Sequence, residues 1–263
     1  MRGAKALTFF DDPAPLAFAH RGGALLPAND GIENTLVAFR NAVDLGYRYL
    51  ETDVHCSRDG VVYAFHDVEL TRMAGAVSAF RDLDADAIDA IRVGGREPIP
   101  RLAELLEAFP DARFNIDVKA DDAADPTLDV LRDAGALDRV CLASFSEARL
   151  LRLRAAVPTV PTCLSSGEIA RLRFAPRRHT QSRGVHRGGA CVQVPHSRGR
   201  ITVVTPGFVR RAHTLDLPVH VWTVDDPAEM RYLLDIGVDG LMSDRVDVLR
   251  DVLLERGQWR WER

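Results

Sequence analysis

The sequence predicts a (β/α)8 barrel, the α/β fold also called a TIM barrel, in which eight parallel strands close into a cylinder inside a ring of helices. Short apolar runs rich in β-branched and aromatic residues alternate with amphipathic stretches, which is typical of repeated βα units. Eight such runs are present. The chain has 263 residues, a usual length for such a barrel, so we expect a single domain over residues 1–263.

The expected strands cover residues 16–20, 49–54, 113–118, 139–145, 159–164, 190–194, 218–224 and 238–242. The expected helices lie between them, at residues 33–45, 100–108, 126–134, 146–156, 206–214, 226–235 and 245–256. Gly46 follows the first helix and Pro100 opens the second, and these residue types are typical of helix ends and helix starts. No Gly-x-Gly-x-x-Gly motif follows the first strand, which disfavours an open dinucleotide-binding sheet.

One segment interrupts this alternation after the second strand. Asp59-Gly60 is a strong hairpin signal, so residues 61–65 are expected to fold back as an extra strand. Residues 68–98, with a helix-like acidic stretch at 82–91, are then expected to form a small insertion over the mouth of the barrel.

Composition and charge limit the classes of function. The net charge of −4 and the pI near 6.1 oppose nucleic-acid binding, which usually needs a basic face. No segment is long and apolar enough for a signal peptide or an integral membrane segment. The four cysteines form no Cys-x-x-Cys pair, so we expect reduced, mostly buried thiols. Together these features predict a cytoplasmic protein, and they leave its oligomeric state open.

Chemically reactive residues follow the first two strands. His20 and Arg21 end the first strand, and Glu51 and Asp53 lie one residue apart at the end of the second. Barrel active sites gather at the C-terminal ends of the strands, so these side chains should converge. Alternate residues point to the same face of a strand. Glu51 and Asp53 would therefore repel each other unless a cation lies between them.

The third strand repeats this pattern with Asp117 and Lys119. Three carboxylates suit one divalent metal ion, Mg²⁺ or Ca²⁺. Lys119 is expected to reach a phosphate oxygen rather than the metal. His66, after the hairpin strand, brings a second histidine to the same region. The sequence thus predicts a site where acid, base, metal and phosphate meet.

Several short motifs share one order and spacing with a known family. They are His20-Arg21-Gly22, Glu33-Asn34-Thr35, Glu51-Thr52-Asp53, Asp59-Gly60, His66-Asp67 and Trp222-Thr223-Val224. In this respect the chain resembles the glycerophosphodiester phosphodiesterase family over nearly its whole length. The resemblance implies a TIM barrel, a divalent metal, and hydrolysis of a phosphodiester to an alcohol and a phosphomonoester.

The resemblance also implies roles for particular residues. His20 and His66 would be the general base and acid, and Arg21 would bind the phosphate. Glu51 and Asp53 would hold the metal. The third ligand in the family is usually a glutamate, where this chain has Asp117.

Four further residues are expected to support this chemistry from nearby. Glu33 would orient His20 or approach the metal from outside its ligand shell, and Asn34 would hold an imidazole tautomer. Trp222 ends the seventh strand and would form an apolar wall for a glycerol backbone, the alternative being core packing. Gln193 is a polar residue in an apolar strand and would line the same pocket or pack in the core.

Three functions compete. The first is metal-dependent hydrolysis of a small-molecule glycerophosphodiester to sn-glycerol 3-phosphate and an alcohol, with water or the substrate's own 2-hydroxyl as nucleophile. The second is a lysophospholipase D-type phosphodiesterase, which needs an apolar groove; its hint is the arginine-rich segment 165–189, which a solvated surface also explains. The third is a barrel that binds a phosphorylated ligand without hydrolysis.

Overall fold

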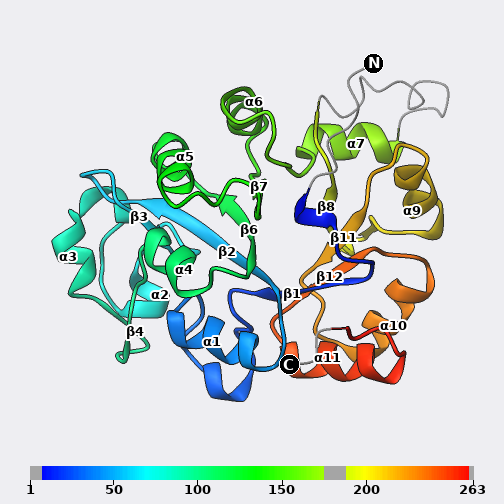
Figure 1. Cartoon of the computed structure of the whole chain (residues 1–263), viewed down its shortest axis with the longest axis horizontal. Coiled ribbons are helices and arrows are strands. Elements are labelled where there is room, and N and C mark those ends of the chain that lie inside the picture. The colour runs from blue at the N-terminus through cyan, green and yellow to red at the C-terminus, as the bar shows by residue number, and fades with distance from the viewer. Residues whose placement is uncertain (1–7, 175–187, 261–263) are drawn as a thin grey trace.

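The computed structural model describes residues 8–174 and 188–260. A curled parallel sheet surrounded by helices forms an α/β barrel (Figure 1). Its strands are hydrogen-bonded in the order β7 (Val140–Ala143), β6 (Arg113–Val118), β2 (Tyr49–Cys56), β1 (Leu16–His20), β12 (Gly240–Ser243), β11 (Val219–Trp222) and β8 (Val192–Pro195). The predicted fold class is confirmed.

The strand predicted at residues 159–164 is much shorter than expected. It consists of two isolated parallel bridges, from Thr162 to Leu142 and from Cys163 to Cys191, which close the barrel between β7 and β8. The Cys163 amide donates to the Leu142 carbonyl at 3.0 Å. The segment contains Pro161, and proline has no N–H to donate to a neighbouring strand. A longer ladder is therefore blocked.

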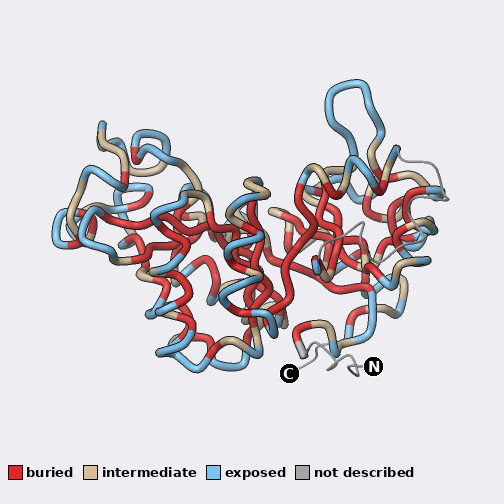
Figure 2. Tube along the Cα trace, turned by 90° about the horizontal axis from the view of Figure 1, so that it is seen from above, coloured by how far each residue is buried: buried red, intermediate tan, exposed pale blue. Residues whose placement is uncertain are grey.

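The predicted helices are present with small shifts in their ends. They are α1 (Leu36–Asp44), α4 (Leu102–Ala108), α5 (Ala124–Asp133), α6 (Glu147–Ala156), α9 (Pro206–His213), α10 (Pro227–Asp235) and α11 (Val246–Glu255). Figure 2 shows that the buried parts of the trace lie inside and the exposed parts at the periphery. Helix α1 starts later than expected because Asn34 has a left-handed backbone (φ 59°) and Thr35 accepts from the Ala38 amide as the N-cap.

Helix α7 (Ser166–Phe174) occupies the start of the arginine-rich segment 165–189, where no regular helix was expected. Ser165 and Glu168 form reciprocal bonds: the Glu168 amide donates to Ser165 Oγ at 3.2 Å, and the Ser165 amide donates to Glu168 Oε2 at 2.7 Å. This Ser-x-x-Glu capping box was a readable start signal. The remaining arginines of the segment, at 177, 178, 183 and 187, lie outside the described residues.

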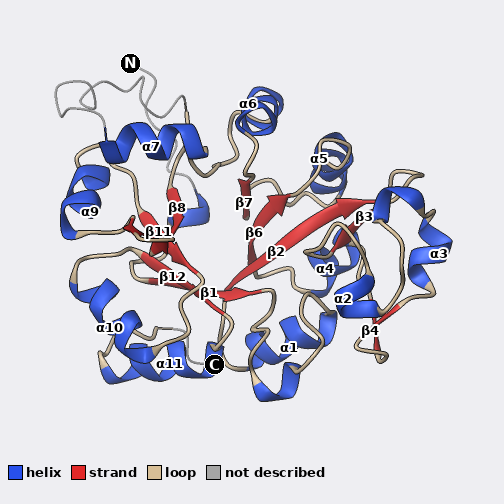
Figure 3. Ribbon diagram, turned by 180° about the vertical axis from the view of Figure 1, so that it is seen from behind, coloured by secondary structure: helices blue, strands red, loops and turns tan. Residues whose placement is uncertain are grey.

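The extra strand after Asp59-Gly60 is confirmed as β3 (Val62–Ala64), antiparallel to β2. The insertion that follows contains α2 (Thr71–Ala74), η3 (Phe80–Asp82), α3 (Ala85–Asp89), β4 (Arg92–Val93) and β5 (Glu97–Pro98). Its own apolar core packs against β3, at the edge of the barrel, so the expected position over the mouth is wrong (Figure 3). The mouth is flanked instead by α7 and by the hairpin β9 (Ser197–Arg198) and β10 (Ile201–Thr202).

Two short 3₁₀ turns, η1 (Thr8–Phe10) and η2 (Pro27–Asn29), precede β1 and α1 respectively. Phe9 packs against Phe18 and Tyr49 in the buried apolar core of the barrel. Across the described residues, no helix combines the length and the apolar character needed to cross a membrane.

His220 on β11 is a buried histidine whose two ring nitrogens have no hydrogen-bond partner. Its ring lies 5.1 Å from the ring of Phe18, centroid to centroid. Burial lowers the pKa of His220 to about 4, although Asp239 opposes the shift. The unfolded chain therefore binds this proton more tightly than the folded chain, so stability is complete above about pH 6.5 and falls as the pH drops towards 4.

We predict that His220→Leu makes the free energy of unfolding less dependent on pH. The titration of this one group can account for up to about 3 kcal/mol of stability lost between pH 6.5 and 4. Urea denaturation of both proteins across this pH range measures the effect. An unchanged slope in the variant would show that His220 is not the group responsible.

Candidate active site

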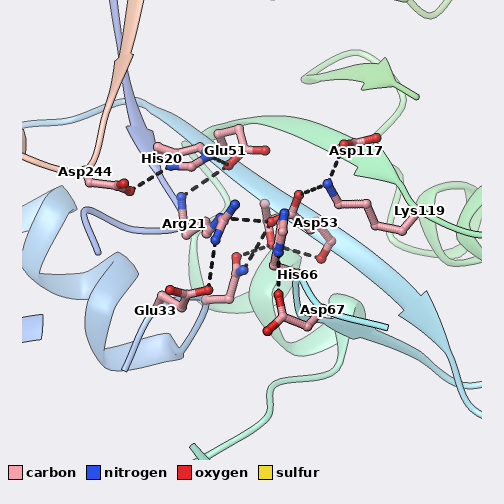
Figure 4. Close-up of polar contacts among 12 residues, drawn as sticks. His20, Arg21, Glu33, Glu51, Asp53, His66, Asp67, Asp117, Lys119 and Asp244 are labelled. Carbon is pink, nitrogen blue, oxygen red and sulfur yellow. Dashed lines mark hydrogen bonds and ion pairs between the residues drawn. The ribbon is translucent and has the colours of Figure 1, made fainter. Parts of the chain in front are cut away.

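A cavity of about 810 Å³ opens at the C-terminal ends of the barrel strands. Most of the residues singled out from the sequence line it: His20, Arg21, Glu51, Asp53, His66, Asp117, Lys119, Gln193 and Trp222. Glu33 and Asn34 do not line the cavity, but they contact residues that do. Figure 4 shows that the charged groups among them point towards one another.

Strand register brings the acidic side chains together. His20 pairs with Glu51 across β1 and β2, and Asp53 pairs with Asp117 across β2 and β6. Beyond His20 the chain turns sharply, with a left-handed backbone at Arg21 (φ 50°) and at Gly22 (φ 81°). A Cβ on Gly22 would lie 2.9 Å from backbone atoms of α1, so only glycine fits there. This turn brings Arg21 back towards Asp53.

Lys119 and Arg21 neutralise Asp53. Lys119 Nζ lies 2.7 Å from Asp53 Oδ1 and 2.7 Å from Asp117 Oδ2, and Arg21 Nε lies 3.3 Å from Asp53 Oδ2. Burial would raise the pKa of Asp53, but the charges of Lys119 and Arg21 outweigh it and lower that pKa. Burial and the neighbouring Asp53 raise the pKa of Glu51 to about 7. Protonation of Glu51 therefore costs less free energy than protonation of Asp53 at neutral pH.

Each candidate catalytic histidine is held through Nδ1 by a carboxylate. His20 Nδ1 lies 2.7 Å from Asp244 Oδ1, and His66 Nδ1 lies 2.6 Å from Asp67 Oδ1. Nε2 is then the nitrogen that can exchange a proton with a substrate. Burial would lower the pKa of His20, but the charges of Glu51 and Asp244 raise it overall.

The histidine partners expected for Glu33 and Asn34 are replaced by other groups, and the alternative expectation, that Glu33 lies outside the ligand shell of a metal, stays a prediction. Glu33 Oε1 accepts from Arg21 Nη1 at 3.0 Å and does not contact His20, whose carboxylate partner is Asp244. Asn34 Nδ2 donates to Asp53 Oδ2 at 3.4 Å, and its Oδ1 accepts from a threonine hydroxyl, not from an imidazole. The turn through Arg21 carries its side chain between Glu33 and the inner acids, which keeps Glu33 away from His20.

Arg72, from the insertion, links the two sides of the site and was missed by the sequence reasoning. Its guanidinium lies 2.6 Å from Asp67 Oδ2 and 2.7 Å from Glu33 Oε1. A continuous chain of polar contacts thus runs from Arg21 through Glu33, Arg72 and Asp67 to His66. Burial would raise the pKa of Asp67, but hydrogen bonds from Arg72 and His66 lower it to about 2.

Gln193 and Trp222, the other two predicted residues that line the cavity, provide one polar and one apolar wall. The Gln193 amide donates to Asn115 Oδ1 at 2.7 Å, a contact with a neighbour that the sequence reasoning did not select. The Trp222 ring packs edge-on against Phe145, with ring centroids 5.8 Å apart. Both residues line the cavity, so neither is a pure core residue.

Residues 20–248 match the family model of the glycerophosphoryl diester phosphodiesterase family. The chain belongs to this family. It is 41% identical over 264 residues to the probable glycerophosphodiester phosphodiesterase 2 of Mycobacterium tuberculosis, covering 98% of this chain and 97% of that protein. Glycerophosphodiester hydrolysis is therefore its activity.

Solved structures of similar fold accompany this match. A putative glycerophosphoryl diester phosphodiesterase from Silicibacter pomeroyi superposes with a TM-score of 0.77 at 24% identity, over 94% of this chain and 96% of that one. An Oleispira antarctica phosphodiesterase, solved with the product sn-glycerol-3-phosphate, superposes with a TM-score of 0.77 at 20% identity, over 91% of this chain and 97% of that one. These likenesses support the barrel.

Enzymes of this family generally depend on a divalent metal ion. Within residues 8–174 and 188–260, no three side chains of His, Cys, Asp or Glu are grouped closely enough to hold one, and Lys119 Nζ lies 2.7 Å from a carboxylate oxygen of each of Asp53 and Asp117. The donor chemistry nevertheless fits. Asp117 Oδ1 is a buried carboxylate oxygen with no hydrogen-bond partner, and carboxylate oxygens are the ligands that Mg²⁺ and Ca²⁺ prefer.

We predict that Arg72→Gln lowers kcat by about 10- to 100-fold, the usual cost of losing a group that orients a functional side chain. The expected change in KM is small, because Arg72 does not line the cavity. Steady-state kinetics over a range of pH, compared with the exposed control Arg81→Gln, measure this effect. Equal kcat and pH profiles in the two variants would rule out a positioning role for Arg72.

Proposed function

We propose that the chain hydrolyses small glycerophosphodiesters with one divalent metal ion, Mg²⁺ or Ca²⁺, and two histidines. The observation that carries this proposal is the convergence of His20 and His66, each held by a carboxylate, on one cavity with buried acids. Glu51, Asp53 and Asp117 would hold the metal. When bound, the ion supplies positive charge to a non-bridging phosphate oxygen.

The side chains of the protein perform the remaining steps. Arg21 and Lys119 bind phosphate oxygens and stabilise the charge that grows on the phosphoryl group. One of His20 and His66 removes a proton from the attacking hydroxyl, of water or of the substrate's 2-hydroxyl, and the other protonates the leaving alkoxide. Each such proton transfer contributes roughly 10² to 10⁴ in rate.

Four other residues shape the site around these groups. Trp222 provides an apolar wall for the glycerol carbons, and Gln193 a polar one. Glu33 positions Arg21, and Asn34 positions Asp53, as their hydrogen bonds indicate. This arrangement limits how a small diester can lie in the cavity.

We place the reaction in the cytoplasm. The four cysteines are free and buried, which suits a reducing compartment. The partner we propose is the small-molecule substrate.

We predict that His20→Ala and His66→Ala each lower kcat for glycerophosphocholine by at least about 10². EDTA should abolish the activity, and added Mg²⁺ or Ca²⁺ should restore it. Choline release measures turnover, and the exposed His213→Gln serves as the matched histidine control. Full activity of His20→Ala in EDTA would contradict the mechanism, and binding of glycerophosphocholine by the wild type without turnover would favour a ligand-binding barrel.

A further inference from the structure

His20 depends for its orientation on the turn that follows the last strand of the barrel. Its Nδ1 lies 2.7 Å from Asp244 Oδ1, and Asp244 lies in the turn between β12 and α11. A functional side chain keeps its geometry only where the groups that contact it are themselves held in place. The conformation of this turn therefore decides which way the imidazole faces.

Asp225, from the segment between β11 and α10, holds this turn. Its Oδ1 accepts hydrogen bonds from the amides of Asp244 at 2.8 Å and Arg245 at 3.2 Å. The same oxygen accepts from the Ser243 hydroxyl at 2.9 Å. Hydrogen bonds to an ionised carboxylate are stronger than those between neutral groups. One oxygen atom thus fixes three consecutive residues around the partner of His20.

Asp225 is itself fixed by its neighbours in the chain. The amide of Val224 donates to the Met242 carbonyl at 3.0 Å, and the Val224 side chain is fully buried. On the other side, Asp226 is the N-cap of α10 and accepts from two amides of that helix. The Asp225 carboxylate therefore starts from a defined position.

The support of His20 differs from that of His66. Arg72 contacts the carboxylate of Asp67, the partner of His66, and so changes its charge environment. Asp225 contacts the backbone amide of Asp244. A substitution at position 225 that removes this contact should therefore move the Asp244 carboxylate without removing it.

A purely structural role for Asp225 is the alternative. Amides at the start of a helix have no partner within the helix, and a carboxylate near them is favourable because of the helix dipole. Helix α11 begins directly after the turn, and its N-cap residue, Arg245, makes no side-chain cap. An experiment must therefore separate support of α11 from orientation of His20.

We propose that Asp225 is a positioning residue, which holds the turn that presents Asp244 to His20 and so keeps His20 Nε2 facing the cavity. This inference rests on the proposed function and adds a residue to its machinery. Neither Asp225 nor Asp244 lines the cavity, whereas His20 does. The loss of Asp225 should therefore change kcat more than KM.

Removing the acceptor at position 225 tests this role with glycerophosphocholine as substrate and Mg²⁺ present. Asp225→Ala should lower kcat by about 10- to 100-fold with little change in KM, because a misplacement of about 1 Å can cost two orders of magnitude in rate. Asp225→Asn should recover most of this loss, since its amide oxygen can accept from the same amides. Wild-type kcat in Asp225→Ala would overturn the proposal.

Asp226→Ala is the matched control. It removes the neighbouring carboxylate, which also accepts from helix amides, so the thermal unfolding midpoint should fall in both alanine variants. The kcat should fall in Asp225→Ala and stay near the wild-type value in Asp226→Ala. Equal losses of kcat in the two folded variants would identify Asp225 as a structural cap and overturn the positioning role.

A double-mutant cycle tests whether Asp225 acts through Asp244. Asp244→Ala should lower kcat, and adding Asp225→Ala to it should cause no further loss, because two residues in one chain of contacts are not additive. Additive losses in the double variant would show that Asp225 acts by another route. Wild-type kcat in Asp244→Ala would equally overturn the proposal.

A measurement without substrate separates this inference from the proposed function. In protein with ¹⁵N-labelled histidine, the His20 Nδ1–H group that donates to Asp244 should give a proton resonance that is missing from His20→Gln. The resonance should persist in Asp225→Asn and shift or disappear in Asp225→Ala. This pattern in a wild type without turnover of glycerophosphocholine would contradict the proposed function and support the positioning of His20. An unchanged resonance in Asp225→Ala, with an active wild type, would overturn the positioning role alone.

Discussion

The burial of carboxylates at the ends of two paired strands is the constraint on which the rest of the site depends. The parallel register of β2 and β6 sets Asp53 beside Asp117, and Glu51 lies two residues before Asp53 on the same face of β2. Buried charges of one sign are costly unless cations neutralise them. Lys119 and Arg21 provide these cations for Asp53. The sharp turn after β1 points the Arg21 side chain towards Asp53.

Much of this could be predicted from the sequence, because the relevant signals are local. Short apolar runs identify the strands, and the rule that barrel sites form at strand ends predicts that His20, Glu51 and Asp117 lie close together. The extra strand β3 was predictable for the same reason, since Asp59-Gly60 specifies a hairpin without help from distant residues. Short stretches of sequence are thus sufficient to predict that Glu51, Asp53 and Asp117 belong to the site.

The parts that could not be predicted depend on contacts between distant residues. Asp244 is 224 positions from His20, and Arg72 reaches Glu33 from an insertion whose packing no periodicity describes. The fifth strand is short although its residues favour a strand, because Pro161 has no N–H group to donate to a neighbouring strand. Helix α7 differs, because the capping box of Ser165 and Glu168 is a local signal from which the start of this helix could have been predicted.

The bond between His20 and Asp244 ties the first strand of the barrel to the segment after the last, and β1 also pairs directly with β12. During synthesis on the ribosome, the strands that carry Glu51, Asp53 and Asp117 are made long before residue 244. His20 lacks its orienting carboxylate throughout that time. The carboxylate that orients His20 is therefore among the last parts of the chain to be made, whereas His66 has its orienting carboxylate in the next residue, Asp67.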